Sequence, residues 1–191
     1  MMRRDDAIKA ILKHRGDAAI MAVYNTGLDL RRIAPSPLNL YSAGAMGQAS
    51  SWGLGLALGM PERKIMVLDG DGSLLMNLGT LVTIANAAPR NLFHFVFENG
   101  CYEANGSHPI PGQNRIHFAG IAREAGIAHS FDFDDLASFE TSLGRILALE
   151  GPVFACLKVV PGDPSPQDYI YVNSPDRLRE FKAAIGTGKK G

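Results

Sequence analysis

Short apolar runs alternate with longer amphipathic stretches along almost the whole chain of 191 residues. The runs that read as buried strands are 18–24, 38–41, 64–68, 91–97, 127–131 and 153–160. The stretches with helical character are 3–15, 28–34, 46–60, 74–88, 116–125, 135–149 and 175–185. This alternation predicts an α/β fold, a doubly wound parallel sheet flanked by helices. Since no linker or internal repeat divides the sequence, we expect a single domain over residues 1–191.

Composition and charge narrow the class of protein. The formal net charge is zero and the sequence has no basic stripe, so we expect no nucleic-acid partner. Gly, Ser or charged residues interrupt every apolar stretch well before the roughly 18 residues that span a bilayer, and the acidic start is unlike a signal peptide. With only Cys101 and Cys156, we expect a cytoplasmic protein without membrane association.

Glycine is concentrated in one part of the chain, where eight of the 21 glycines lie between Gly44 and Gly79. This density indicates backbone that comes close to a ligand or to another backbone. Gly, Ala and Ser are also frequent in the predicted helix 46–60. We therefore expect this helix to pack very closely against a neighbour.

Gly70-Asp71-Gly72-Ser73 directly follows a predicted strand. In such a turn the backbone N–H groups can approach an anion, and a helix that begins at Ser73 favours a phosphate at its N-terminus. Asp71 would repel a bare diphosphate, unless it binds a divalent cation that the diphosphate shares. Mg²⁺ prefers oxygen ligands of this kind and shares them readily with phosphates.

Asn99 follows the next strand and offers a neutral side-chain oxygen. A backbone carbonyl two residues later, at Cys101, would complete the protein ligands of the cation. Ligands of doubly wound sheets bind outside the carboxyl ends of the strands, so we expect both loops at one edge. The alternative is that Gly-Asp-Gly and Asn-Gly are only turns, a common use of these residues.

These residues resemble the cofactor fingerprint of the thiamine diphosphate (ThDP) enzymes, in which Gly-Asp-Gly-Ser precedes an asparagine at a strand end by some thirty residues. The segment 44–47, the glycine-containing helix that follows it, and 74–81 are similar to the beta subunit of sulfopyruvate decarboxylase and to phosphonopyruvate decarboxylase. The resemblance covers roughly residues 20–160. It implies the diphosphate-binding (PP-type) fold, with ThDP and Mg²⁺ as cofactors.

The resemblance implies a role for each residue of the fingerprint. Asp71, Asn99 and the backbone oxygen of Cys101 would bind Mg²⁺. Gly72 and Ser73 would contact the diphosphate. Further candidates for contact with the cofactor are Gly70, Tyr102 and Thr26.

Gly44 and Met46 would serve the other end of the cofactor. By resemblance, Gly44 would accept a hydrogen bond from the aminopyrimidine amino group, and the Met46 backbone N–H would donate to a ring nitrogen. The Met46 side chain would support the bent form of the cofactor, which makes Met46 a catalytic candidate. From its pattern alone, a core methionine is the favoured interpretation of Met46, whereas its place between Gly44 and Gly47 favours the supporting role; both stay open.

The loop after Asn99 departs from the family pattern at two positions. Tyr102 and Gly106 match the loop of sulfopyruvate decarboxylases, whereas Glu103 and His108 do not. His108 is a candidate acid or base on the substrate side, since imidazole exchanges protons near neutral pH. The alternative is an ordinary loop histidine. Glu103 would disfavour an anionic substrate if it points inward, so the substrate side chain stays open.

The resemblance covers only half of an active site. ThDP enzymes of this type also need a domain that binds the aminopyrimidine and supplies an activating glutamate. We therefore expect a separate alpha subunit as partner, a homo-dimer or hetero-oligomer as assembly, and a small 2-oxo acid as the substrate that is decarboxylated. The alternatives are a ThDP-dependent carboligase or oxidoreductase subunit, and a ThDP-binding subunit without catalysis. A Rossmann nucleotide-binding module is disfavoured, because no Gly-x-Gly-x-x-Gly opens a helix after the first strand.

Overall fold

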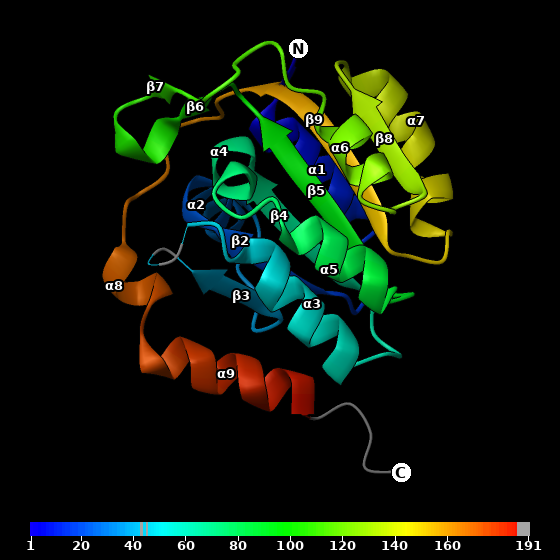
Figure 1. The fold of residues 1–191 in the computed structure, drawn as a ribbon. Helices are drawn as coiled ribbons and strands as arrows, with labels where there is room; N and C mark the ends of the chain where they lie inside the picture. The colour runs from blue at the N-terminus through cyan, green and yellow to red at the C-terminus, as the bar shows by residue number, and fades with distance from the viewer. Residues whose placement is uncertain (43, 45, 187–191) are drawn as a thin grey trace.

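The computed structural model describes residues 1–42, 44 and 46–186. Its centre is a seven-stranded sheet with the order β1-β9-β5-β4-β2-β3, and β8 pairs with β9 off this path. The bounds are β1 (Met2–Arg3), β2 (Ala19–Val23), β3 (Asn39–Ser42), β4 (Ile65–Gly70), β5 (Leu92–Glu98), β8 (His129–Phe133) and β9 (Val153–Val160). All of these pairs are parallel, which confirms the predicted α/β sheet (Figure 1).

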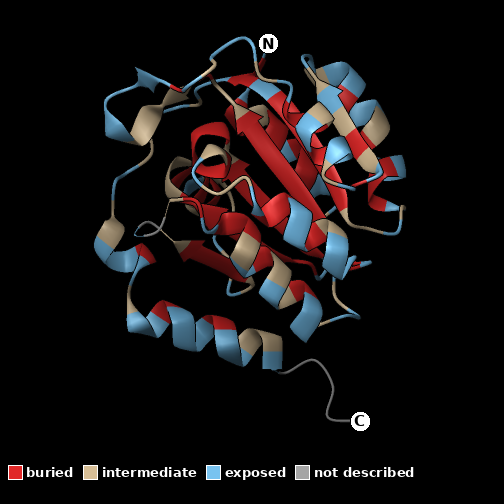
Figure 2. Cartoon of the chain, viewed as in Figure 1, coloured by how far each residue is buried: buried red, intermediate tan, exposed pale blue. Residues whose placement is uncertain are grey.

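Helices cover both faces of this sheet. Their bounds are α1 (Arg4–Lys13), α2 (Tyr24–Ile33), α3 (Ala49–Gly59), α4 (Asp71–Leu75), α5 (Thr80–Ala87), α6 (Phe118–Glu124), α7 (Leu136–Leu147), α8 (Tyr169–Val172) and α9 (Pro175–Gly186). α1, α2 and α7 pack on one face, and α3 to α6 pack on the other. The central strands are therefore buried on both sides and the outer helix faces are exposed (Figure 2). Within the described residues, no helix is long and apolar enough to cross a membrane.

The close packing expected of the small-residue helix is confirmed at Gly53 of α3. A Cβ atom at Gly53 would lie 2.2 Å from Cγ2 of Val67 on β4, and 3.4 Å from Cδ1 of Leu92 on β5. No side chain fits in that space. α3 therefore lies directly on the sheet at this point because residue 53 has no side chain.

The order of the strands creates a crevice at the carboxyl ends of β2 and β4. β3 lies on one side of β2 and β4 lies on the other. The order in which strands are added across the sheet therefore reverses after β3. The helix that follows β2 packs on one face of the sheet, and the helix that follows β4 packs on the other. In open α/β sheets, ligands bind between loops that diverge in this way.

The prediction of one helix over 74–88 is wrong, because the structure divides this stretch into α4 and α5. The chain turns at 76–79, where the Asn77 side chain donates to the carbonyl of Gly47 at 3.0 Å. That bond holds the turn against the segment before α3. The apolar spacing continues through the break, so it could not reveal a turn that a distant carbonyl stabilises.

The first strand-to-helix connection is also shorter than expected. α2 begins at Tyr24, whereas the sequence predicted a helix from residue 28. Thr26 makes the early start possible, because its hydroxyl accepts a hydrogen bond from the Val23 backbone N–H at 3.3 Å. The loop after Asn99 contains β6 (Cys101–Tyr102), a 3₁₀ turn η1 (Glu103–Asn105) and β7 (His108–Pro109), with β6 and β7 antiparallel.

Candidate functional site

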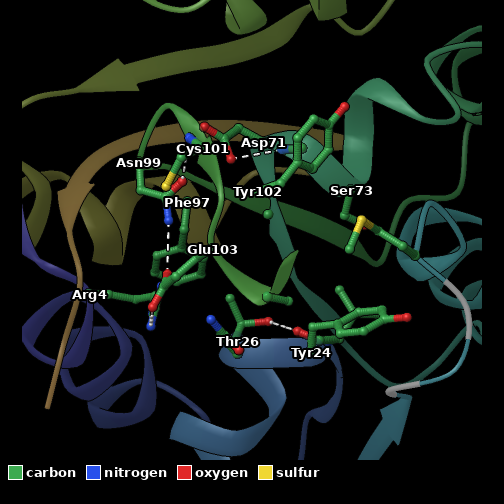
Figure 3. A pocket seen from close by; sticks show the side chains of 16 residues that line it. Arg4, Tyr24, Thr26, Asp71, Ser73, Phe97, Asn99, Cys101, Tyr102 and Glu103 are labelled. Carbon is green, nitrogen blue, oxygen red and sulfur yellow. Dashed lines mark hydrogen bonds and ion pairs between the residues drawn. The ribbon is translucent and has the colours of Figure 1, made fainter. Parts of the chain in front are cut away.

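A cavity of about 60 Å³ lies at the carboxyl ends of β2, β4 and β5. Its walls include most of the site residues predicted from the sequence, namely Thr26, Met46, Gly70, Asp71, Gly72, Ser73, Asn99, Cys101 and Tyr102. A wider hollow of about 700 Å³ adjoins it, and Tyr24, Met46 and Tyr102 line both. The site is thus a small inner end, whose lining side chains Figure 3 shows, next to a broad groove.

Asp71 is a buried carboxylate at the inner end, at the start of α4. Its Oδ1 accepts from the Gly72 N–H at 2.7 Å, and its Oδ2 accepts from the Gly100 N–H at 2.7 Å. Burial raises the pKa of Asp71 to about 6, although these backbone hydrogen bonds lower it; the nearby charge of Glu98 also raises it. A divalent cation beside this carboxylate would stabilise the ionised form and reverse the shift.

Asn99 lies at the same inner end, in the loop that leaves β5. Its Oδ1 accepts from the Cys101 N–H at 3.0 Å, and its Nδ2 donates to Oε2 of Glu103 at 2.9 Å. The amide is therefore held at both ends. The structure places Asp71 and Asn99 in the lining of one cavity. The sequence predicted that they meet, because their loops leave neighbouring strands.

The atoms available here are of the kind that Mg²⁺ prefers. Asp71 supplies a carboxylate and Asn99 an amide oxygen, and Cys101, which lines the same cavity, has a backbone carbonyl. Burial raises the pKa of the Cys101 thiol, which favours the protonated form. Within the described part of the chain, no group of three or more His, Cys, Asp and Glu side chains is arranged so that it could hold a metal ion by itself. An oxygen-ligated cation fits this chemistry, whereas a zinc site built from such side chains does not.

Gly72 and Ser73 shape the wall next to Asp71. A Cβ atom at Gly72 would lie 2.6 Å from Cδ1 of the Tyr102 ring, so Tyr102 can pack here only against a glycine. The Ser73 hydroxyl accepts from the Gly47 N–H at 3.1 Å. Its own hydrogen is available to an anion, and the bond also places the 46–48 segment beside the cavity.

Thr26 lines the cavity but uses its hydroxyl for structure. Its Oγ1 lies 2.7 Å from the carbonyl oxygen of Val23 and 2.8 Å from that of Leu68. It thereby joins the start of α2 to β4. What this segment offers a diphosphate is the first turn of α2, whose backbone N–H groups have no acceptor within the helix.

Tyr24 is a site residue that the sequence pattern did not indicate. It opens α2 with a φ of +45°, a conformation that costs a non-glycine residue of the order of 1–3 kcal/mol. Its side chain lines both the inner cavity and the wider hollow (Figure 3). The only sequence signal was its place between a buried strand and Asn25-Thr26-Gly27.

Gly44, Met46 and His108 meet in the wider hollow. Met46 is half-buried and lines both spaces, so it is not a core methionine. His108 is exposed on β7 and lies in the hollow together with Asn105, outside the inner cavity. Ala45, which completes the 44–47 segment, lies outside the described residues.

Glu103 and Arg4 form an ion pair at the inner end that the sequence did not predict. Arg4 donates from Nη1 to Oε2 of Glu103 at 2.5 Å and from Nε to Oδ2 of Asp29 at 2.6 Å. Burial alone would raise the pKa of Glu103, but hydrogen bonds led by those of Arg4 lower it overall. Glu103 is therefore an ionised side chain whose charge Arg4 offsets. The pair joins residues 99 positions apart, which no local pattern can reveal.

Comparison with known proteins also indicates a ThDP-binding domain. Residues 16–156 match the thiamine pyrophosphate enzyme family in its C-terminal TPP binding domain, where TPP is another name for ThDP. The chain is 39% identical over 167 residues to the sulfopyruvate decarboxylase subunit beta of Methanothermobacter thermautotrophicus, covering 85% of each. It is 31% identical over 176 residues to the phosphonopyruvate decarboxylase of Streptomyces viridochromogenes, covering 92% of this chain but 44% of that one.

The fold has a solved counterpart. An X-ray structure assigned as a thiamin diphosphate-dependent enzyme from Mycobacterium smegmatis superposes with a TM-score of 0.69 at 21% identity. It matches 84% of this chain, which is 32% of that chain. The family match, the relatives and the arrangement of Asp71 and Asn99 agree with the resemblance noted from the sequence. The chain therefore belongs to the thiamine pyrophosphate enzyme family, as its C-terminal TPP-binding domain.

Proposed function

We propose that this chain is the diphosphate-binding, beta-type subunit of a ThDP- and Mg²⁺-dependent decarboxylase of small 2-oxo acids, similar to sulfopyruvate and phosphonopyruvate decarboxylases. The observation that carries the proposal is the meeting of Asp71 and Asn99 in one cavity at the carboxyl ends of β4 and β5. Names of the relatives support the reaction type. In this proposal, residues 1–191 form one diphosphate-binding domain.

Asp71, Asn99 and the Cys101 carbonyl would hold Mg²⁺. The diphosphate would lie in the inner cavity between the first turn of α2 and the wall that Gly70, Gly72 and Ser73 contribute. The raised pKa of Asp71 supports a cation at this place, because a buried carboxylate needs a charge partner to stay ionised. When bound, ThDP provides the electron sink that lets a 2-oxo acid lose carbon dioxide.

The residues of the wider hollow would position the reacting end of the cofactor. Met46 would support the bent conformation from below, and the Gly44 carbonyl would accept from the aminopyrimidine amino group. His108 lies at the open side of the hollow, where an imidazole nitrogen can hold or release a proton near the substrate. No described residue that lines this hollow is a lysine or arginine, so a sulfonate or phosphonate substrate would need a cation from the partner.

A partner subunit would supply the missing half of the site. This chain covers only 44% of the phosphonopyruvate decarboxylase relative, and other relatives are named as beta subunits. The hollow is open, and apolar side chains on the α3–α5 side of the molecule are exposed, with Trp52 at 43%, Leu58 at 57% and Val82 at 59%. We propose an alpha subunit that binds the aminopyrimidine with its glutamate, within a homo-dimer-based or hetero-oligomeric assembly. The free cysteines Cys101 and Cys156 favour the cytoplasm.

Calorimetric titration with ThDP tests the proposal, with and without Mg²⁺ and with and without the candidate alpha subunit. We expect binding that requires Mg²⁺ and that Asp71→Ala weakens by about tenfold or more, the loss typical of a disturbed metal site. Equal binding by the variant would reject the metal assignment. Analysis of the products formed with the partner present separates the reactions: an aldehyde supports decarboxylation, whereas a longer 2-hydroxy ketone would indicate a carboligase.

A further inference from the structure

Asn99 has a property that a carboxylate ligand lacks, because the two ends of its side chain are chemically different. The oxygen can bind a cation, whereas the NH₂ group can only donate hydrogen bonds. The two ends have nearly the same shape, so rotating the amide by half a turn exchanges them without a steric penalty. A metal site that uses Asn99 therefore needs a neighbour that distinguishes the ends.

Glu103 is placed to make this distinction. Its Oε2 accepts from Nδ2 of Asn99 at 2.9 Å, while Oδ1 of Asn99 accepts from the Cys101 N–H at 3.0 Å. A carboxylate has no hydrogen to donate. If the amide were reversed, the Asn99 oxygen would face the Glu103 oxygen, and the NH₂ group would face the Cys101 N–H. Both contacts of the reversed form are repulsive.

Arg4 fixes Glu103 in the position that this requires. Its Nη1 and Nη2 reach the two carboxylate oxygens of Glu103 at 2.5 and 3.2 Å. Its Nε donates to Asp29 on α2 at 2.6 Å, and the Arg4 and Asp29 side chains are 6% and 2% exposed. Arg4 thus links the start of α1 to α2 through Asp29 and to the loop after β5 through Glu103, the second of which Figure 3 shows. The guanidinium also supplies the charge that makes a partly buried carboxylate tolerable beside a metal site.

We propose that Glu103, held by Arg4, is a positioning residue that orients the Asn99 amide with its oxygen toward Mg²⁺. The inference rests on the proposed function, because it assumes that Asn99 is a metal ligand. Glu103 acts through Asn99 and is not itself a ligand of the cation in this arrangement. Neighbours that orient a metal ligand in this way typically contribute about tenfold to hundredfold to metal affinity.

Two other roles for Glu103 make different predictions. A purely electrostatic role would attract Mg²⁺ through the negative charge alone, whatever residue stands at position 99. A purely structural role would join the loop to α1 and would change stability without a specific effect on the metal. Replacing the proposed metal ligand in an Asn99→Asp variant separates these two roles from orientation. The new carboxylate has two equivalent oxygens, so it needs no neighbour to orient it.

The first measurement is the Mg²⁺ concentration that half-saturates ThDP binding, determined by calorimetry on the full chain with its partner subunit. We expect Glu103→Gln to raise it about 10- to 100-fold, because glutamine can present either its oxygen or its NH₂ group to Asn99. The matched control is Glu98→Gln. Glu98 precedes Asn99 directly, but its Oε2 accepts from the Cys156 thiol at 3.2 Å and not from the amide. Because the charge of Glu98 also acts on Asp71, this control measures the loss of a nearby charge, and we expect it to change the Mg²⁺ concentration much less than Glu103→Gln does.

The second measurement repeats Glu103→Gln in the Asn99→Asp background, where the effect should change sign. In Asn99→Asp alone, the new carboxylate would face the carboxylate of Glu103. Adding Glu103→Gln replaces that repulsion with an NH₂ donor, so the double variant should bind Mg²⁺ more tightly than Asn99→Asp alone. The same loss in both backgrounds would overturn the orienting role in favour of a charge effect. A loss after Glu98→Gln as large as that after Glu103→Gln would overturn it as well.

Thermal unfolding of every variant identifies a structural effect. If Glu103→Gln alone does not fold, the double variant still can, because it restores the hydrogen bond between residues 99 and 103 with donor and acceptor exchanged. Its comparison with Asn99→Asp then decides, and weaker binding by the double variant overturns the proposal. If the wild-type protein binds ThDP and Mg²⁺ and Glu103→Gln binds them equally well, only the role of Glu103 is rejected. If the wild-type protein does not bind ThDP and Mg²⁺ even with its partner subunit present, the proposed function is rejected, and this inference is rejected with it.

Discussion

At the scale of single residues, the site depends on how buried charges are compensated. In the described part of the chain, the hydrogen bonds to Asp71 come from backbone N–H groups and not from a basic side chain, and burial raises its pKa to about 6. Glu103, a few residues beyond Asn99, has Arg4 beside it and a lowered pKa. Asp71 is therefore the carboxylate whose charge a divalent cation would balance.

The raised pKa of Asp71 predicts a pH dependence of cofactor binding. Mg²⁺ binds the ionised carboxylate, so protons compete with it below about pH 6, and the apparent affinity should fall as the pH decreases through that value. Calorimetry on both sides of this pH measures the effect. Asp71→Asn should bind weakly throughout and lack this transition, and the difference between the two profiles removes the titration of ThDP itself. Parallel profiles would contradict the prediction.

Gly72 predicts a steric effect on the same site. In Gly72→Ala the new Cβ would lie 2.6 Å from the Tyr102 ring, so the ring must move, at a cost of about 1–3 kcal/mol in unfolding free energy. Because Tyr102 lines the cavity, ThDP affinity should fall as well. Gly79→Ala is the control: nothing lies within 4 Å of that position, and its φ of −58° suits alanine. A Gly72→Ala protein as stable as the control would show that the ring moves without cost.

At the scale of elements, α3 shows how one glycine sets the distance between a helix and a sheet. Gly53 and Gly55 are both inside α3, yet only Gly53 faces β4, where a Cβ would lie 2.2 Å from Val67. Nothing lies within 4 Å of a Cβ at Gly55. The two positions thus separate the packing role of glycine from its helix propensity.

This pair predicts opposite effects of the same substitution. Gly53→Ala should lower the unfolding free energy by about 1–3 kcal/mol, because the helix must move away from β4 and β5. Gly55→Ala should raise it by about 0.5–1 kcal/mol, because alanine loses less backbone entropy in a helix. Urea unfolding at equilibrium measures both. A stabilising Gly53→Ala would mean that the distance between α3 and the sheet is adjustable.

At the scale of the whole molecule, the two ends of the site differ in how far this chain encloses them. The inner cavity has walls from the loops after β2, β4 and β5, whereas the hollow that adjoins it is wide and lies beside residues of the 44–48 segment. A beta-type subunit that meets an alpha subunit at this face would have that arrangement.

The open end predicts that turnover needs a second chain. The purified protein alone should decarboxylate 2-oxo acids at a rate lower by on the order of 100-fold or more than the complex with an alpha subunit, because in the proposed function that subunit supplies the glutamate that activates the cofactor by proton transfer. Release of carbon dioxide, measured with each component alone and together, checks this. Full activity of the isolated chain would reject the divided site.

The sequence by itself determined the fold class, the six strands β2 to β5, β8 and β9, and the two loops that carry Asp71 and Asn99. These features are local: apolar runs, helical spacing and the residues that directly follow a strand decide them. Parallel strands then bring neighbouring carboxyl ends to one edge, so the meeting of these two loops also follows from the pattern.

The tertiary structure alone decided which neighbours complete the site. Arg4 reaches Glu103 across the molecule, Tyr24 lies strained between two cavities, and the Gly47 carbonyl divides the predicted helix 74–88 at Asn77. These arrangements depend on the packing of helices and loops on the sheet, which sets the distance between groups far apart in the chain. Local patterns contain no information about that distance. The contact of Glu103 with Asn99 and Arg4 was therefore found only in the structure, whereas the meeting of Asp71 and Asn99 was predictable from the sequence.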